Sequence, residues 1–348
     1  MSTIWNGAAA RRRTLWPGLM ALLAAVILIV AGCGGDDDGS GSSGAAAEDT
    51  VKLSFSHSNT TAHPHHRAVE LIADRVRDHG IEIEVFPNSQ LGADDERFPA
   101  LQAGDIDIDL QGSSALSATF GPIGILDTAY LFDGPDQLFE FFDGDESQQL
   151  REEFEEATGT KILGVWFFGM RHFTANRPIR KPEDLQGLRM RFPDSPRFLA
   201  NARALGADAT AVAFEEVFLS LQQGVIDGQE NPVPTINEMK FVEVQDYVSL
   251  TGHQTGSQLA LINREKWEAL TQDQQEALQS AFDAARAEDR KWIEELDQKL
   301  LDEWRDSGDM KIVDDVDTDA FRRQAVEYFS ENFKGQELEL FETIRGLR

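Results

Sequence analysis

The chain has 348 residues, enough for two domains or one two-lobed unit, and a chain of this length can bury a core without disulfides. Its 61 acidic and 32 basic side chains give a formal net charge of −29, which makes nucleic acid and anionic lipid headgroups poor partners. The single cysteine, Cys33, cannot form an intramolecular disulfide, and a hydrophobic content of 41% argues against a disordered chain.

The first 33 residues have the pattern of an export signal. Three arginines, Arg11 to Arg13, precede an apolar run from Leu19 to Ala31, which is shorter than the roughly 20 residues of a membrane-spanning helix. The run ends in Val-Ala-Gly-Cys33, which resembles the lipobox of bacterial lipoproteins, in which the cysteine is lipidated and becomes the mature N-terminus. We expect a lipoprotein signal peptide over 1–33. An ordinary signal peptide, a single membrane anchor and twin-arginine export are the alternatives.

Residues 34–50 are rich in Gly, Ser and Asp, which bury little apolar area, so we predict a flexible tether there. Strand and helix patterns alternate after it. Apolar alternation or short apolar runs predict strands at 51–56, 81–86, 106–110, 162–168, 188–192, 225–228 and 258–262. Helical spacing predicts helices at 66–77, after the loop at 88–92, at 196–205 and at 214–222. Strands separated by helices favour an α/β fold with a largely parallel sheet.

A longer helix is expected from Thr271 to Trp304, where apolar residues keep near-helical spacing with no Pro or Gly between them. At 1.5 Å per residue such a helix would be about 50 Å long. Because this exceeds the size of one small lobe, we expect it to run along two lobes.

Positive charge is concentrated between Arg171 and Arg203, where eight basic residues are interrupted by three acidic ones. In an acidic chain such a cluster can draw an anion into a cleft, although individual arginines can instead pair with surface carboxylates. Arg191 is distinctive because it lies at the carboxyl end of a predicted strand, just before Pro193, where α/β sheets bind ligands. Its planar guanidinium can hold a carboxylate through two parallel hydrogen bonds.

The polar segment Gln229 to Pro232 follows the strand predicted at 225–228. An amide in that position can donate a hydrogen bond to a ligand oxygen, and an ordinary turn explains the tetrapeptide equally well.

Several stretches resemble the solute receptors of TRAP (tripartite ATP-independent periplasmic) transporters, and the likeness covers roughly residues 51–330. They are 86–92 (FPNSQLG), 187–193 (GLRMRFP), 214–232 (FEEVFLSLQQGVIDGQENP), 240–245 (KFVEVQ) and 250–253 (LTGH). The resemblance implies a two-lobed clamp of the periplasmic-binding-protein type, closing over a small organic acid. It also implies that Arg191 forms the salt bridge to the ligand carboxylate and that Arg171 and Asn231 support it. Asp194 departs from the usual uncharged residue and could compete for Arg191.

The resemblance sets the expected organisation and function. Residues 51–168 with about 257–290 would form lobe I, and 169–256 with about 291–348 would form lobe II and the C-terminal helices. The chain would capture a C4-dicarboxylate, a hydroxy or oxo acid or a sugar acid outside the cytoplasm, in the periplasm or at the cell surface. It would deliver the acid to a TRAP membrane permease while anchored to the membrane by lipid. A receptor of an ATP-driven importer, a sensor module and a secreted hydrolase or lyase of organic acids are the alternatives.

No cofactor, metal or catalytic residue is expected, because no nucleophile elbow, phosphate loop or dinucleotide fingerprint occurs. Four histidines, His57, His63, His65 and His66, could ligate a metal, but no cysteine or well-spaced carboxylate completes a set, which favours a solvated helix start. Of the aromatic run 166–168, we expect two residues in the core and the third in the ligand pocket.

Overall fold

The computed structural model describes residues 50–347, so the predicted signal peptide, most of the tether and Cys33 lie outside the described residues. The described residues belong to one compact unit. In the described part no helix is both long and apolar enough to cross a membrane.

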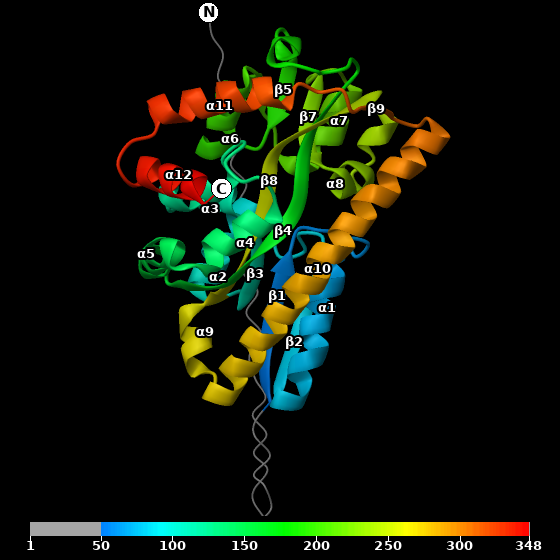
Figure 1. Ribbon diagram of the computed structural model, residues 1–348. Coiled ribbons are helices and arrows are strands. Elements are labelled where there is room, and N and C mark those ends of the chain that lie inside the picture. Colours follow the sequence, from blue (N-terminus) through cyan, green and yellow to red (C-terminus); the bar gives the residue numbers. More distant parts are fainter. Residues whose placement is uncertain (1–49, 348) are drawn as a thin grey trace, which may run out of the picture. The chain divides into compact units, whose positions relative to one another are not determined.

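The strands form one sheet of nine in the order β2-β1-β3-β8-β4-β7-β5-β6, with β9 beside β8 (Figure 1). Their bounds are β1 Val51–His57, β2 Ile81–Phe86, β3 Ile108–Gly112, β4 Thr160–Ala175, β5 Arg189–Phe192, β6 Asp208–Ala211, β7 Gly228–Pro232, β8 Tyr247–Asn263 and β9 Lys311–Val313. We call β2, β1 and β3 the β1 end of the sheet, and β7, β5 and β6 the β5 end.

The sheet is mixed, not largely parallel as predicted. Strands within each end are parallel, but β8 is antiparallel to β3 and β4, and β4 is antiparallel to β7. With 16 and 17 residues, β4 and β8 are the longest strands described and connect the two ends. The antiparallel pairs all involve β4 or β8, the two strands that connect the ends of the sheet. Strand direction of this kind depends on which distant segments pair, and the local helix and strand patterns of the sequence do not reveal it.

Twelve α-helices of the described residues cover the sheet. Their bounds are α1 Pro64–Val76, α2 Asp94–Ala103, α3 Ser113–Leu116, α4 Pro135–Asp143, α5 Gln148–Thr158, α6 Pro196–Leu205, α7 Val217–Gln222, α8 Val233–Glu238, α9 Arg264–Ala269, α10 Gln272–Ser307, α11 Thr318–Asn332 and α12 Gln336–Gly346. Local capping accounts for the clearest of them. At the start of α6 the Ser195 hydroxyl accepts the Phe198 amide at 3.3 Å, and Gly206 ends the helix with φ of 80°.

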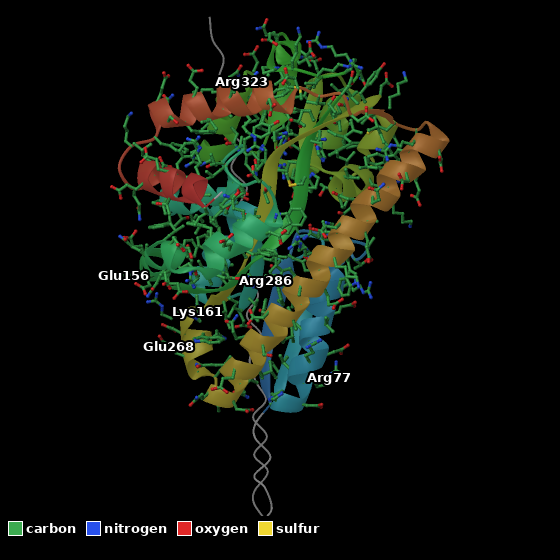
Figure 2. The ribbon with its side chains drawn as sticks, in the orientation of Figure 1. Arg77, Glu156, Lys161, Glu268, Arg286 and Arg323 are labelled. Atoms are coloured by element: carbon green, nitrogen blue, oxygen red, sulfur yellow. The ribbon has the colours of Figure 1, made fainter. Side chains whose placement is uncertain are left out.

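Helix α10 is the predicted long helix, with 36 residues and a length of about 54 Å. Thr271 caps its start in a capping box with Gln274. Figure 1 shows it running obliquely from the region of α1 and β1 to that of α8 and β9, and it packs against α1, β4, α8 and β9. Arg286, labelled in Figure 2, pairs with Asp143 at the end of α4, at 2.7 Å, and so ties the middle of α10 to α4.

The buried core forms three clusters, and α10 contributes to two of them. Its first half places Leu278 and Phe282 in the cluster formed by α1, β1 and β3. Its last turns place Leu300 and Trp304 in the cluster with α7 and α8. The third cluster packs α2, α4, α5, α6, α11 and α12 on the sheet. One helix therefore belongs to the cores at both ends of the sheet, as predicted.

Candidate functional site

A cavity of about 520 Å³ lies where the two ends of the sheet face each other. Its lining includes the carboxyl ends of five strands: Asn59 after β1, Gln111 on β3, Arg191 on β5, Val212 after β6 and Asn231 on β7. The middle parts of β4 and β8, the starts of α2, α3 and α6, and the segment after β6 also line it. Because β1 and β3 run against β5, β6 and β7, their carboxyl ends converge on one space, which is where open α/β sheets bind ligands.

The sheet register puts all three sequence-predicted ligand residues in this lining: Arg191, Arg171 and Asn231. One predicted strand was misplaced. The strand expected at 225–228 is observed at Gly228–Pro232, and Val225 is exposed. Gln229 to Pro232 are therefore not a turn but the buried strand itself, which pairs with β4 on one side and β5 on the other.

Arg191 is a buried cation without a carboxylate partner. Its exposed fraction is 3%, and its Nε donates to the Val212 carbonyl at 2.9 Å. Among residues 50–347 no carboxylate lies within salt-bridge distance of its guanidinium, Asp194 included. Burial lowers its pKa to about 10, so it remains charged at neutral pH. A buried charge of this kind is costly until an anion pairs with it.

Arg171 is already paired. Its Nε and Nη2 donate to the two Glu230 carboxylate oxygens at 2.5 and 2.8 Å, and Nη2 also donates to Asn231 Oδ1 at 3.0 Å. Burial raises the pKa of Glu230, but the charge and hydrogen bonds of Arg171 outweigh it and leave that pKa below its ordinary value. The Phe198 ring lies under the guanidinium, with its centroid 4.9 Å from Cζ. Arg171 is thereby held rigidly, and its Nη1 makes no hydrogen bond within the described residues.

Asn231 is oriented by its neighbours. Its Oδ1 accepts from Arg171, and its Nδ2 donates to Gln229 Oε1 at 2.6 Å, which leaves one amide hydrogen for a ligand. Sequence reasoning missed Glu230 as the partner of Arg171. The signal was available, because an acidic residue within a buried strand requires a partner.

The other arginines of the positive cluster are occupied or exposed, as the alternative interpretation expected of individual residues. Arg180 pairs with Asp315, Arg189 with Asp227 and Arg197 with Glu337. Arg177 is exposed and donates to the backbone carbonyls of Asp184 and Gln186. Arg191 thus differs from its neighbours in sequence by being buried, cavity-facing and unpaired within the part of the chain described.

The wall at the β1 end of the cavity is polar and lacks basic side chains. Gln111, Gln258 and Asn59 present buried amides there, and Asp94 and Asp95 lie at the start of α2. Fully buried Arg97 reaches behind this wall to Asp109 at 3.0 Å and to Asp94 at 2.7 Å. Trp166 and Phe167 are core residues and Phe168 lines the cavity, as expected for that aromatic run.

The histidine cluster is not the solvated helix start that we predicted, because all four side chains are buried. His57 and His66 contact each other at 3.1 Å, and His65 contacts Asp289 of α10 at 2.9 Å. Burial lowers the pKa of His57 and of His65 to about 3, so both are neutral at pH 7. The described residues contain no group of three or more ligands that could hold a metal ion. The cluster instead packs α1 against α10, through contacts between residues more than 200 positions apart that the sequence does not reveal.

Comparison with known proteins provides independent evidence on the family and the fold of this chain. A family model described as bacterial extracellular solute-binding protein, family 7, matches residues 55–336. The 2,3-diketo-L-gulonate-binding periplasmic protein YiaO of Escherichia coli (strain K12) is 31% identical over 253 residues, which are 72% of this chain and 76% of that protein. The C4-dicarboxylate-binding periplasmic protein DctP of Rhodobacter capsulatus is 32% identical over 244 residues, which are 69% of this chain and 72% of that protein.

A solved structure extends the likeness to the fold. The crystal structure of a TRAP periplasmic solute-binding protein from Roseobacter denitrificans, with bound 3-deoxy-D-manno-oct-2-ulosonic acid, has a TM-score of 0.81 and 27% sequence identity. The match covers 86% of this chain and 100% of that one.

Proposed function

The chain belongs to bacterial extracellular solute-binding protein family 7, and on that premise we propose that Arg191, with Arg171 and Asn231, binds the carboxylate of its solute. The fold is the two-lobed clamp of TRAP periplasmic solute-binding proteins, and the function is that of an extracytoplasmic receptor for a small organic acid. Relatives named for a diketogulonate and for C4-dicarboxylates indicate the breadth of acids in the family.

The observation that carries the site assignment is the buried, unpaired guanidinium of Arg191. Glu230 neutralises Arg171, so the pair Arg171–Glu230 serves as a rigid support, and Arg191 supplies the net positive charge. A ligand carboxylate can accept two parallel hydrogen bonds from Arg191 and further ones from the unbonded Nη1 of Arg171 and the remaining amide hydrogen of Asn231. Because the two walls come from different ends of the sheet, the ligand gains contacts to both only when they close on it.

We place lobe I at 51–168 with about 257–290, and lobe II at 169–256 with about 291–348. Support comes from the two separate cores that α10 joins and from the long strands β4 and β8, which cross between the ends. We call the cavity side with Asn59, Gln111 and Gln258 the amide wall, and the side with Arg171 and Arg191 the arginine wall. In this division the amide wall belongs to lobe I and the arginine wall to lobe II.

The partner proposed for the loaded receptor is a TRAP permease in the membrane, and the proposed attachment is a lipid on Cys33. Family membership supports the first and the Val-Ala-Gly-Cys33 motif supports the second. Cys33→Ser should abolish incorporation of a radiolabelled fatty acid and release the protein from membranes. A mutant that stays bound, beside a wild type that takes up no label, would contradict the anchor.

Family members are solute-binding receptors, and we propose that this chain likewise performs no catalysis. The test is a thermal-shift screen of organic acids, followed by calorimetry and by chromatography of each binding acid after incubation with protein. We expect a rise in melting temperature with recovery of unchanged acid. Conversion of the acid at a rate above that of buffer would instead favour a secreted hydrolase or lyase.

A further inference from the structure

The charge balance of the arginine wall matches one carboxylate. Arg171 and Arg191 are the only basic side chains of the described residues that line the cavity, and Glu230 pairs with Arg171. The three buried charged groups Arg171, Arg191 and Glu230 therefore carry a net single positive charge, which one ligand carboxylate neutralises, and the exposed Asp194 and Glu215 that also line the cavity supply no cation for a second one. A second carboxylate on the ligand would have to find its partner on the opposite wall.

The opposite wall offers that second carboxylate no cation. Asp94 and Asp95 line the cavity there, and the nearby Arg97 is buried and already shared between Asp94 and Asp109. Arg97 carries one positive charge and is bonded to two carboxylates, so this wall has a net negative charge. A ligand carboxylate placed against it would be repelled and left without a hydrogen-bonded counter-ion.

The same wall holds amides that lack partners. Gln111 is 1% exposed; its Nε2 donates to the Asp94 carbonyl at 3.0 Å, which fixes the orientation of the amide, and its Oε1 has no partner within residues 50–347. Gln258 and Asn59 are also buried, and neither side-chain amide makes a hydrogen bond to any described residue. Such groups are uncommon in folded proteins and are costly to leave unpaired.

These three amides lie together. Gln111 and Asn59 are at the carboxyl ends of the neighbouring strands β3 and β1, where His57 is paired in register with Leu110. Gln258 on β8 pairs in register with Gly112, the residue after Gln111. The three amide residues therefore come from neighbouring strands of the sheet, and all three line the cavity that the two arginines line.

The chemistry of the amides selects among ligand groups. Gln111 Oε1 requires a donor, whereas Gln258 and Asn59 each present both a donor and an acceptor. A carboxylate can only accept, an ammonium can only donate, and a methylene does neither. A hydroxyl does both, so a run of hydroxyls satisfies the whole surface.

We infer that this site selects polyhydroxylated monocarboxylates, the class of the sugar acids, over dicarboxylates of the same length. The carboxylate lies against Arg191, and the hydroxyls lie against Asn59, Gln111 and Gln258. This assignment rests on the proposed function, since it takes the Arg191 end of the cavity as the carboxylate site.

The test is calorimetry on the purified full chain with acids matched in length. The four-carbon set is D-erythronate, D-threonate and succinate. The six-carbon set is D-gluconate, D-galactonate, D-mannonate, L-gulonate, adipate and hexanoate. We expect at least one hydroxylated monocarboxylate to bind about 100-fold or more tightly than the dicarboxylate of its length, because sites built to hydrogen-bond hydroxyls reject analogues lacking them. Equal or tighter binding of succinate or adipate would overturn the assignment.

Two variants connect the preference to the amide wall. Gln258→Leu removes an amide that bonds to no described residue, so the fold loses no hydrogen bond while the best hydroxylated acid should bind roughly 10- to 100-fold more weakly. Gln149→Leu, on the exposed face of α5, is the matched control and should leave affinity unchanged. Unchanged affinity in Gln258→Leu would also overturn the assignment, provided that its melting temperature matches that of the wild type.

Arg191→Ala distinguishes failure of the proposed carboxylate site from failure of the preference for hydroxyls. If dicarboxylates bind as tightly as hydroxylated acids and Arg191→Ala abolishes both, the proposed function stands and the preference for hydroxyls falls. If Arg191→Ala leaves the binding of every acid unchanged, or if no acid of either set binds the wild type, the carboxylate site itself is wrong and both conclusions fall.

Discussion

At the scale of one residue, the proposed role of Arg191 depends on its having no carboxylate partner among the described residues. Many arginines of this chain have a carboxylate within salt-bridge distance, whereas this one is buried with only the Val212 carbonyl as a described hydrogen-bond partner. Desolvating a guanidinium without a counter-ion destabilises the empty receptor locally. Pairing with a ligand carboxylate removes that cost, so the carboxylate contributes strongly to the binding free energy.

Substitutions at Arg191 should therefore have effects that charge alone does not explain. Arg191→Lys keeps the charge but loses the planar pair of donors, so we expect markedly weaker binding. Arg191→Ala leaves the ligand carboxylate unpaired, at a cost of about 2–5 kcal/mol, or roughly 30- to several-thousand-fold in affinity.

The matched control for those substitutions is Arg177→Ala, which removes an exposed arginine of the same positive cluster and should change affinity little. Calorimetry on the three variants distinguishes the alternatives. Equal modest losses at Arg191 and Arg177 would mean that the cluster acts only as a diffuse field.

His172 gives a pH-dependent prediction at the same scale. Its Nδ1 accepts the Gly252 amide at 3.0 Å, and burial, with a smaller contribution from His253, lowers its pKa from 6.5 to about 3. The unfolded chain binds this proton more readily, so the contribution of His172 to stability is full above pH 6.5 and is lost as the pH falls towards 3.

His172→Asn removes the titration, so its stability penalty relative to the wild type should shrink by about 2 kcal/mol between pH 7.5 and 5, at about 1.4 kcal/mol per pH unit below 6.5. Urea unfolding of both proteins at the two pH values provides the measurement. A penalty that does not change with pH would show that His172 is not held neutral.

At the scale of elements, β4 and β8 pack closely where they run between the two ends of the sheet. Gly169 pairs with Gly256 in the middle of both strands, and Gly169 has φ of 113°. A Cβ on Gly169 would lie 2.7 Å from Pro232 Cβ of β7. Both the backbone conformation and the contact exclude a side chain at this point.

Gly169→Ala should therefore lower the free energy of unfolding by at least about 2 kcal/mol. Gly164→Ala is a stringent control, because it lies on the same strand and a Cβ there meets no atom within 4 Å. Denaturant unfolding of the two variants should separate them clearly. A similar loss in both would indicate general intolerance of β4 to substitution.

Elements with strong local signals could be predicted from the sequence. The helix at 196–205 is flanked by Ser195 and Gly206, and α6 has those bounds. The uninterrupted apolar spacing from Thr271 to Trp304 likewise predicted α10. The site residues Arg191, Arg171 and Asn231 were placed together by their likeness to a known pattern, and the structure puts them in one cavity.

Features that depend on pairing between distant segments could not be predicted. The polar residues Gln229 to Asn231 suggested a turn, because a strand buried on both sides normally carries apolar residues. Glu230 can be buried there because it pairs with Arg171 and contacts His253 at 3.3 Å. The histidines suggested a solvated helix start, because the covering α10 lies more than 200 residues further along the chain. The amide wall likewise requires β1, β3 and β8 to be neighbours.

At the scale of the whole molecule, we propose that the two lobes move relative to each other around one site. Ligand contacts are divided between the amide wall and the arginine wall, so a closed form is favoured only when both walls are occupied. Small-angle scattering of the full chain should show a smaller radius of gyration with saturating ligand. No change on saturation would indicate a rigid cavity, and Arg191→Ala at the same ligand concentration is the control.

The strand order also determines when the protein can fold during its synthesis. β3 ends at Gly112, but its neighbour β8 extends to Asn263, and the core of β1 and α1 is completed by Phe282 of α10. Neither end of the sheet can form completely while the ribosome is still making the first two thirds of the chain. Folding is therefore a late event that involves nearly the whole chain. For a chain that acts outside the cytoplasm this delay is useful, since a polypeptide that has not yet folded can still be threaded through a narrow export channel.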